Sequence, residues 1–211
     1  QNPKGIVITL PDAAALGKSV KAAIAAGIPV ISMNSGSDDY ASLGISVHVG
    51  QTEFEAGVGG GQKMKAAGGK KALCVNHEVG NVALDRRCAG FKKGFGGSVD
   101  ILGTSNDPTE IQKAVAAKLG AGYDTILTLG ASLAGEPALA AIEAAGKLGK
   151  VRLGTFDMSP NMLKAAAAGK VEFLIDQQQY LQGYLPIVIF AQYMRWGTMP
   201  AGVVMTGPGF V

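Results

Sequence analysis

Apolar runs and helix-forming segments alternate along the whole chain. The apolar runs occupy 5–10, 28–33, 45–50, 71–76, 99–103, 124–130, 151–156 and 171–176. The segments with helical pattern and capping signals occupy 13–26, 52–69, 81–95, 107–119, 135–146, a short stretch from 160 and 179–196. Runs that are apolar throughout, rather than alternating, are typical of parallel strands buried on both faces. With helices as right-handed crossovers between them, the pattern predicts an open α/β sheet fold.

Helix starts are marked by short polar side chains. Asp12 and Asp107 each precede a helical segment, and Thr52 stands three residues before Glu55 in the manner of a capping box. Pro108 follows Asp107 in the first turn of its helix. Glu110 is expected to be the capping-box partner of Asp107. We therefore expect Asp12, Thr52 and Asp107 to serve first as helix caps.

Composition excludes several classes of protein. The 211 residues are 47% hydrophobic and 17% charged, which is typical of a globular chain. The net charge of +3 is scattered over single and paired lysines, so no nucleic-acid partner is expected. The longest apolar stretch, 184–197, is interrupted by Gln192 and Arg195 and is too short to span a membrane. No signal peptide heads the chain, and a processed chain would look the same.

Polar residues follow the predicted strands at their carboxyl ends, where open parallel sheets bind ligands. Asn34, Asp157 and Gln177 are the first candidates, because no helix starts immediately after them. The remaining residues at these positions include Asp12, Ser35, Gln51, His77, Glu78, Ser105, Asn106, Ser132 and Gln178. Amides, hydroxyls and a few carboxylates suit a neutral, polyhydroxylated ligand, whose hydroxyl groups both donate and accept hydrogen bonds.

Motifs for nucleotide binding or catalysis are incomplete. The segment "GASLAGEP" has the glycine spacing of a phosphate-binding loop but carries Glu136-Pro137 where Lys and Ser/Thr are required. The segment "GVGGG" (57–61) lies inside a helix and is interpreted as a close-packing surface for another helix. His48 falls within a strand, and no nucleophile is specified for His77. We expect no enzyme activity and no cofactor.

Both cysteines lie in "CVNHEVGNVALDRRC" (74–88). Cys74 falls within a strand, and Cys88 shares a helix face with Leu84, Phe91 and Phe95, so both point into one helix–sheet interface. A metal site is not expected, because three or four ligands do not converge there. A disulfide and two packed thiols both remain open, since a covering helix lies about 10 Å from its sheet whereas a disulfide needs Cα atoms within about 7 Å.

The order of motifs "GIVITLPD…AGIPVISMNSG…HVGQTEFEAG…VALDRRCAGF…LGTFDMSP…DQQQYLQGY" covers essentially the whole chain. It resembles the sugar-binding proteins of bacterial ABC transporters, of the ribose-binding, type I periplasmic type. The resemblance implies two α/β lobes joined by a hinge, which close on a monosaccharide or related polyol and present it to a membrane permease. It also implies a periplasmic location.

The resemblance assigns sugar-binding roles to Asn34, Asp157 and Gln177 at the matching positions. Asp85 stands where ribose binders carry a sugar-binding Arg, which argues against ribose itself. Ser132 lies where the family often has Asn. The site predicted for this chain is Asn34, Asp85, Asp157, Gln177, His77, Ser132 and Asp12.

Two βα units that precede "GIVITLPD" in the family are absent from this sequence. The resemblance then divides the chain into an incomplete N-terminal lobe, 1–51 plus 178–203, and a C-terminal lobe, 52–177 plus 204–211. An incomplete lobe exposes a sheet edge, from which we expect self-association. The alternative function is the effector-binding core of a lactose-repressor-type transcription regulator, which shares this fold.

Overall fold

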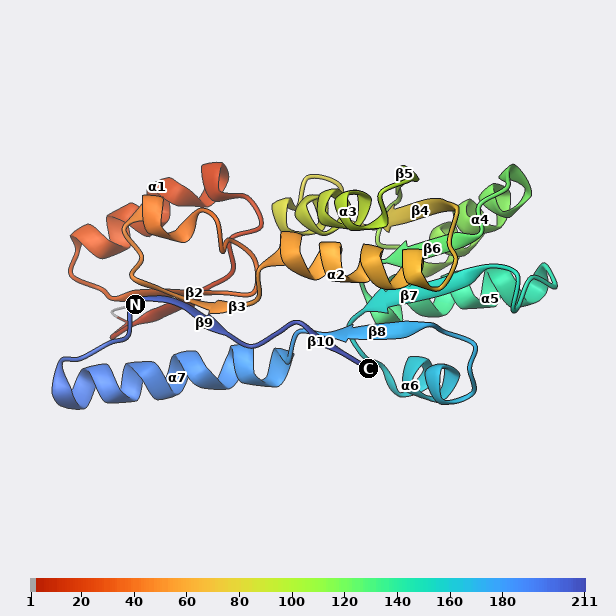
Figure 1. Ribbon diagram of the computed structural model, residues 1–211. Coiled ribbons are helices and arrows are strands. Elements are labelled where there is room, and N and C mark those ends of the chain that lie inside the picture. Colours follow the sequence, from red (N-terminus) through yellow and green to blue (C-terminus); the bar gives the residue numbers. More distant parts are fainter. Residues whose placement is uncertain (1–2) are drawn as a thin grey trace. The chain divides into compact units, whose positions relative to one another are not determined.

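The computed structural model describes residues 3–211, which divide into two compact units. Unit 1 contains the residues up to Thr52 together with Gly80–Ala83 and Gln177–Pro208. Unit 2 contains Glu53–Val79, Leu84–Asp176 and Gly209–Val211. The chain therefore passes between the units several times, as Figure 1 shows by colour.

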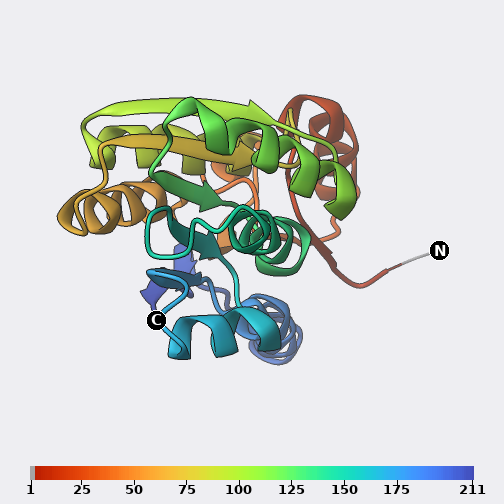
Figure 2. The same cartoon turned by 90° about the vertical axis from the view of Figure 1, so that its right-hand side faces the viewer.

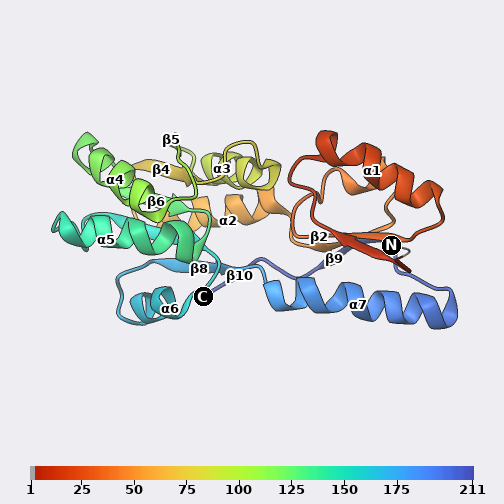
Figure 3. The ribbon, with the colours of Figure 1, turned by 180° about the vertical axis from the view of Figure 1, so that it is seen from behind.

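Unit 1 is a four-stranded parallel sheet in the order β1-β2-β3-β9. Its strands are β1 (Ile6–Ile8), β2 (Val30–Met33), β3 (Val47–Gly50) and β9 (Gly202–Met205). Helix α1 (Ala13–Ala25) packs on one face with a short 3₁₀ helix (Tyr40–Leu43), and α7 (Gln179–Trp196) packs on the other. Figure 3 shows α1 in red and α7 in blue on opposite sides of this sheet.

Unit 2 is a six-stranded sheet in the order β10-β8-β7-β6-β4-β5. Five strands are parallel, and only β10 pairs antiparallel with β8 among the described residues. The strands are β4 (Lys71–Asn76), β5 (Ser98–Gly103), β6 (Thr125–Thr128), β7 (Arg152–Phe156), β8 (Phe173–Asp176) and β10 (Gly209–Phe210). The predicted α/β class with buried parallel strands is confirmed.

Helices cover both faces of the unit 2 sheet. On one face, α4 (Pro108–Lys118), α5 (Glu136–Ala144) and α6 (Pro160–Ala167) enclose an apolar core that includes Leu73, Ile126 and Leu153. A 3₁₀ turn (Leu119–Ala121) extends α4, and a π turn (Ala131–Gly135) leads into α5. On the other face lie α2 (Glu53–Ala66) and α3 (Val82–Phe95). Figure 2 shows these two helices on the opposite side of the sheet from α4 and α5.

Glycines let α2 and α3 touch at their backbones. A Cβ built on Gly57 would lie 2.2 Å from the carbonyl oxygen of Arg87, and one on Gly90 would lie 2.0 Å from that of Phe54. Gly61 and Gly94 meet the opposite helix in the same way. No other residue type fits at such distances, so the interpretation of "GVGGG" as a helix-packing surface is confirmed.

The helix caps predicted at Asp12 and Asp107 are confirmed. Asp12 caps α1 by accepting from the Ala15 amide, and Asp107 caps α4 by accepting from the amides of Thr109 and Glu110. The box role predicted for Glu110 is wrong in detail. Its carboxylate accepts from Ser105 Oγ, and that hydroxyl in turn accepts from the Asp107 amide at 3.2 Å.

Two strands were not predicted, β9 and β10. They are four and two residues long and are bounded by glycine and proline, so they carry little periodic signal.

Along the described part of the chain, no helix combines the length and apolarity that crossing a membrane requires.

Candidate functional site

Strained backbone marks the carboxyl ends of three strands. Among the described residues other than glycine, only Asn34, Asp157 and Gln178 have positive φ, at 60°, 68° and 54°. They follow β2, β7 and β8, with Gln177 standing between β8 and Gln178. Such conformations each cost of the order of 1–3 kcal/mol and cluster at functional sites. Two of the first three candidates thus occupy strained positions.

In unit 2, His77 and Asp157 meet over Gly130. His77 follows β4, Gly130 follows β6 and Asp157 follows β7. These strands are adjacent in the sheet, so the three residues lie at the same edge. A Cβ placed on Gly130 would lie 3.2 Å from His77 Cε1 and 3.7 Å from Asp157 Oδ2. The absence of a side chain at Gly130 therefore leaves room between an imidazole and a carboxylate.

His77 is buried and has an unused polar atom. Its Nδ1 is fully enclosed and has no hydrogen-bond partner in the described part of the structure. Burial lowers the pKa of His77, and the nearby Arg87 lowers it further, while Glu78 and Asp157 act in the opposite direction. A neutral imidazole can donate from one ring nitrogen and accept at the other, which suits a hydroxyl group.

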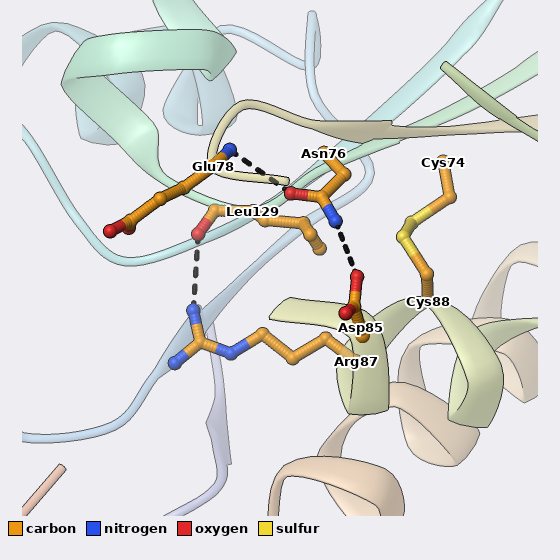
Figure 4. Close-up of a disulfide and its surroundings, with 7 residues drawn as sticks. All are labelled: Cys74, Asn76, Glu78, Asp85, Arg87, Cys88 and Leu129. Carbon is orange, nitrogen blue, oxygen red and sulfur yellow. Dashed lines mark hydrogen bonds between the residues drawn. A yellow bond between two sulfur atoms is a disulfide. The ribbon is translucent and has the colours of Figure 1, made fainter. Parts of the chain in front are cut away.

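Asp85 is exposed on the first turn of α3, where its Oδ1 accepts from Asn76 Nδ2 at 2.8 Å (Figure 4). Asn76 in turn accepts from the Glu78 amide at 3.0 Å and so shapes the loop after β4. Ser132 is exposed on the π turn after β6. The structure therefore places Asp85 beside Asn76, at the carboxyl end of β4.

Cys74 and Cys88 form a disulfide, with their Cα atoms 5.8 Å apart (Figure 4). The spacing of about 10 Å refers to the helix axis, and the facing Cα lies about 2.3 Å nearer to the sheet. The observed 5.8 Å is shorter still, so Cys88 approaches β4 more closely than an average helix–sheet spacing implies. The bond joins β4 to α3 and closes the loop that carries His77 and Asp85. No group of three or more potential metal ligands occurs within residues 3–211.

Unit 1 presents an amide network, which we define as Asn34, Gln177, Gln182 and Thr206. Asn34 Nδ2 donates to the Oε1 atoms of Gln177 and Gln182, both at 3.1 Å. Gln182 Nε2 donates to Thr206 Oγ1 at 3.2 Å, and Thr206 Oγ1 donates to the Gln177 carbonyl at 2.7 Å. The structure thus brings Asn34 and Gln177 together and adds Gln182 and Thr206, which were not predicted.

Asp12 is separate from this network. It is exposed, and its recorded hydrogen bond is the cap to the Ala15 amide at 2.9 Å. His48 lies in β3, as predicted, and has no exposed surface. Burial lowers the pKa of His48 from 6.5 to about 4, and its Nδ1 lies 2.9 Å from Ser32 Oγ.

Arg87 of α3 is the main residue near the site that sequence reasoning missed. It is buried against Glu53, with Nε 2.6 Å from Glu53 Oε2. Burial would lower the pKa of Arg87, but the Glu53 carboxylate outweighs it and raises that pKa. A signal was available, because Arg87 falls three residues after Leu84 and four before Phe91 on the buried helix face.

Comparison with known proteins places these features in context. The family model described as periplasmic binding protein domain matches residues 1–198. A carbohydrate transporter from Acidothermus cellulolyticus 11B, solved in complex with myo-inositol, is 34% identical with a TM-score of 0.93. That alignment covers 99% of this chain and 73% of the other.

Two further relatives are similar. A periplasmic sugar-binding protein of an ABC sugar transporter from Legionella pneumophila is 26% identical, with a TM-score of 0.87, over 97% of this chain and 78% of the other. The xylose/arabinose-binding protein of Sulfolobus acidocaldarius is 24% identical over 94% of this chain. The chain spans only 54% of the length of that curated relative.

These relatives give no support to the transcription-regulator alternative. With a family model that matches nearly its whole length, this chain belongs to the periplasmic binding protein domain family.

Proposed function

We propose that this chain belongs to a solute-binding protein that captures a monosaccharide or related polyol for uptake by an ABC transporter. The observation that carries the proposal is the arrangement of His77 and Asp157 around Gly130 at the carboxyl edge of the unit 2 sheet. A hydroxyl group there could donate to the Asp157 carboxylate and meet the Nε2 side of the His77 ring, which faces Gly130. The relatives' sugars and cyclitol have this chemistry.

In this proposal, units 1 and 2 are the two lobes, and closure about a hinge accompanies binding. Unit 1 also contains Thr52, Gly80–Ala83, Gln177 and residues 204–208, which the sequence had assigned to the C-terminal lobe. Asn34 and Gln177 supply neutral hydrogen-bonding groups, and Asp157, His77 and Asp85 supply the polar groups of unit 2. Ser132 and Asp12 remain weaker candidates, because Ser132 is exposed on the π turn and Asp12 caps a helix. The protein would carry out no chemistry on its ligand and would work in the periplasm beside a membrane permease.

A thermal-shift screen tests the proposal directly. The panel contains D-xylose, L-arabinose, D-ribose, D-glucose, D-allose and myo-inositol, with glucose 6-phosphate and glucuronate as anionic controls. A ligand present at 100 times its Kd stabilises the native state by about 2.7 kcal/mol, so binders raise the melting temperature. Neutral members should give shifts and the anionic controls should not, because an anion would face Asp157. A panel without any shift contradicts the proposal.

Self-association is a further part of the proposal. Strand β1 pairs only with β2 among the described strands, so its outer backbone groups form an open edge. Helix α7 of the same unit exposes large apolar side chains, namely Tyr180, Tyr184, Ile187, Val188, Met194 and Trp196. We expect a concentration-dependent increase in mass in size-exclusion chromatography with light scattering. A monomer at all concentrations contradicts this part alone.

A further inference from the structure

The basic residues of unit 2 collect at one end of its sheet. Strands β4 to β8 are parallel, so the turns that lead into them lie at the amino edge of the sheet, where helices α2 to α6 end. Figure 1 shows the turn before β4 and the ends of α4 and α5 together on the right. We define the basic pole as the cationic residues of these turns and helix ends, namely Lys65, Lys70, Lys71, Lys92, Lys93, Lys118, Lys147, Lys150, Arg152 and Lys170.

Contacts within the basic pole join residues from distant parts of the chain. The short turn after α4 receives two of its lysines. Lys71 Nζ donates to the Ala121 carbonyl at 3.0 Å, and Lys147 Nζ donates to the Leu119 carbonyl. Lys71 Nζ also stands 4.3 Å from the centre of the Tyr123 ring. Lysines that are scattered along the sequence therefore belong to one surface of unit 2.

Negative charge at this end of unit 2 is sparse and already engaged. The carboxylates here accept hydrogen bonds from neighbouring residues or form ion pairs with them, and they are Asp100, Asp124, Glu143 and Glu172. The other carboxylates of unit 2 stand at the opposite edge, where strands end and helices begin, as Glu55, Asp107 and Glu136 do. Unit 2 is thus positive at one end and negative at the other.

Helix ends alone do not account for this separation of charge. Cations in the last turn of a helix complement its macrodipole, which explains Lys92, Lys93 and Lys118. Lys70 and Lys150 are exposed in turns outside the helices. Because the effect of the macrodipole falls off within the last helical turn, it does not explain the positive charge of these turns.

The turns of the basic pole are open to solvent. A Cβ atom would meet nothing within 4 Å at Gly96, Gly122, Gly146 or Gly149. No described part of the chain therefore packs on these glycines. Gly146 and Gly149 have positive φ, 61° and 72°, and stand on either side of Leu148, whose side chain is 40% exposed. This turn presents an apolar side chain between two lysines.

The chemistry of the basic pole fits a lipid surface better than a nucleic acid. Lysine ammonium groups are point charges without a fixed direction, which suits a diffuse layer of anionic headgroups. Tyr123, the aromatic residue beside Lys71, is buried and offers no face on which bases could stack. The exposed Leu148 can enter the boundary between headgroups and acyl chains. We propose that the basic pole docks on the anionic headgroups of a lipid membrane. This inference is independent of sugar binding.

Vesicle co-sedimentation tests the proposal with this chain. The probes are vesicles of phosphatidylcholine alone and vesicles in which about one third of the lipid is phosphatidylglycerol. Binding to the anionic vesicles should be at least about 10-fold tighter than to the neutral ones, because each lysine near an anionic surface adds to the attraction. Raising NaCl from about 0.05 M to about 0.5 M should abolish this difference, since the Debye length then falls to a few ångströms.

Variants locate the contact on the molecule. The basic-pole variant carries substitutions at exposed positions, Lys92→Gln, Lys93→Gln, Lys118→Gln and Lys150→Gln. It should keep the melting temperature of the parent, and its affinity for the anionic vesicles should fall at least about 10-fold. The matched control removes as much positive charge from exposed positions of unit 1, through Lys4→Gln, Lys18→Gln, Lys21→Gln and Arg195→Gln. The control should bind like the parent. Leu148→Gln should weaken binding about 5-fold, because it removes a partly buried apolar contact.

Several results would overturn the proposal. They are equal binding of the parent to neutral and anionic vesicles, parent-like binding by the basic-pole variant, and an equal loss of affinity in the control. If the basic-pole variant does not fold, acetylation of the parent decides. Vesicles should protect Lys92, Lys93 and Lys150 but not Lys18 and Lys21, and equal labelling of both groups overturns the proposal.

A general polyanion site is a separate outcome. Parent-like vesicle binding by Leu148→Gln, together with equal affinity of the parent for a short DNA duplex, would identify such a site. That result would also overturn the proposal of a membrane-docking surface.

Discussion

The carboxyl edges of the two sheets differ in how their polar groups are satisfied. In unit 1, Asn34, Gln177, Gln182 and Thr206 bond mainly to one another, and all four side chains are neutral. In unit 2, a carboxylate and an imidazole with an unused nitrogen flank a glycine, and a buried ion pair and a disulfide lie behind them.

This difference suggests a division of labour in ligand binding. A hydroxyl that enters the amide network must replace an existing hydrogen bond, so the net gain there is small. A hydroxyl that reaches His77 and Asp157 meets a charged acceptor, and hydrogen bonds to charged groups contribute more. We therefore expect unit 2 to supply most of the binding energy and unit 1 to discriminate among hydroxyl arrangements.

The largest stability effect should come from the disulfide, which only unit 2 contains. Cys74→Ala/Cys88→Ala opens a 14-residue separation and should lower the free energy of unfolding by about 3 kcal/mol. Urea denaturation of the parent and the variant measures this difference. Reductant should destabilise the parent and leave the variant unaffected. A difference below about 1 kcal/mol would show that the packing of α2 and α3 already holds α3 against β4 without the disulfide.

A pH effect of about 3 kcal/mol should come from His48 in unit 1. Its pKa is about 4 in the folded protein and 6.5 when exposed, so the unfolded state binds more protons between these values. The contribution is fully present above pH 6.5 and is lost as the pH falls to about 4. Denaturation at a series of pH values should show a shallower decline for His48→Gln than for the parent. Equal slopes would mean that His48 is not buried as a neutral ring.

The amide network should contribute about 2 kcal/mol through Gln182. Gln182→Met keeps the side-chain length but leaves Asn34 and Thr206 without one partner each. The matched control is Gln192→Met on the same helix, where the glutamine is exposed and bonds to Thr198. The control should change the free energy of unfolding by less than about 0.5 kcal/mol. Equal effects of the two substitutions would show that the amide network does not stabilise the fold.

The smallest stability effect should come from Asp12. Asp12→Ala removes the cap of α1 and should lower the free energy of unfolding by about 1 kcal/mol. Asp12→Asn should recover most of that loss, because asparagine caps as well as aspartate. If Asp12→Asn instead abolished sugar binding with unchanged stability, Asp12 would be a ligand residue rather than a cap.

Local signals in the sequence predicted most of the fold but only part of the candidate site. The bounds of the strand at 71–76 and of the helix at 179–196 were predicted correctly. Gln182 and Arg87 were missed, because a polar residue within a helix is usually solvated. Their burial depends on which long-range partner the fold provides, and a helical pattern does not specify that partner.

The central claim is that the charged edge of unit 2 dominates recognition of a neutral polyol. Calorimetric titration of Asp157→Asn with myo-inositol and D-xylose tests it most directly, because asparagine has the same shape and tolerates the positive φ at this position. Asp107→Asn is the matched control, since Asp107 is an exposed helix cap. We predict that Asp157→Asn lowers the affinity at least 10-fold, while Asp107→Asn leaves it unchanged. Parent-like affinity in Asp157→Asn would contradict the account.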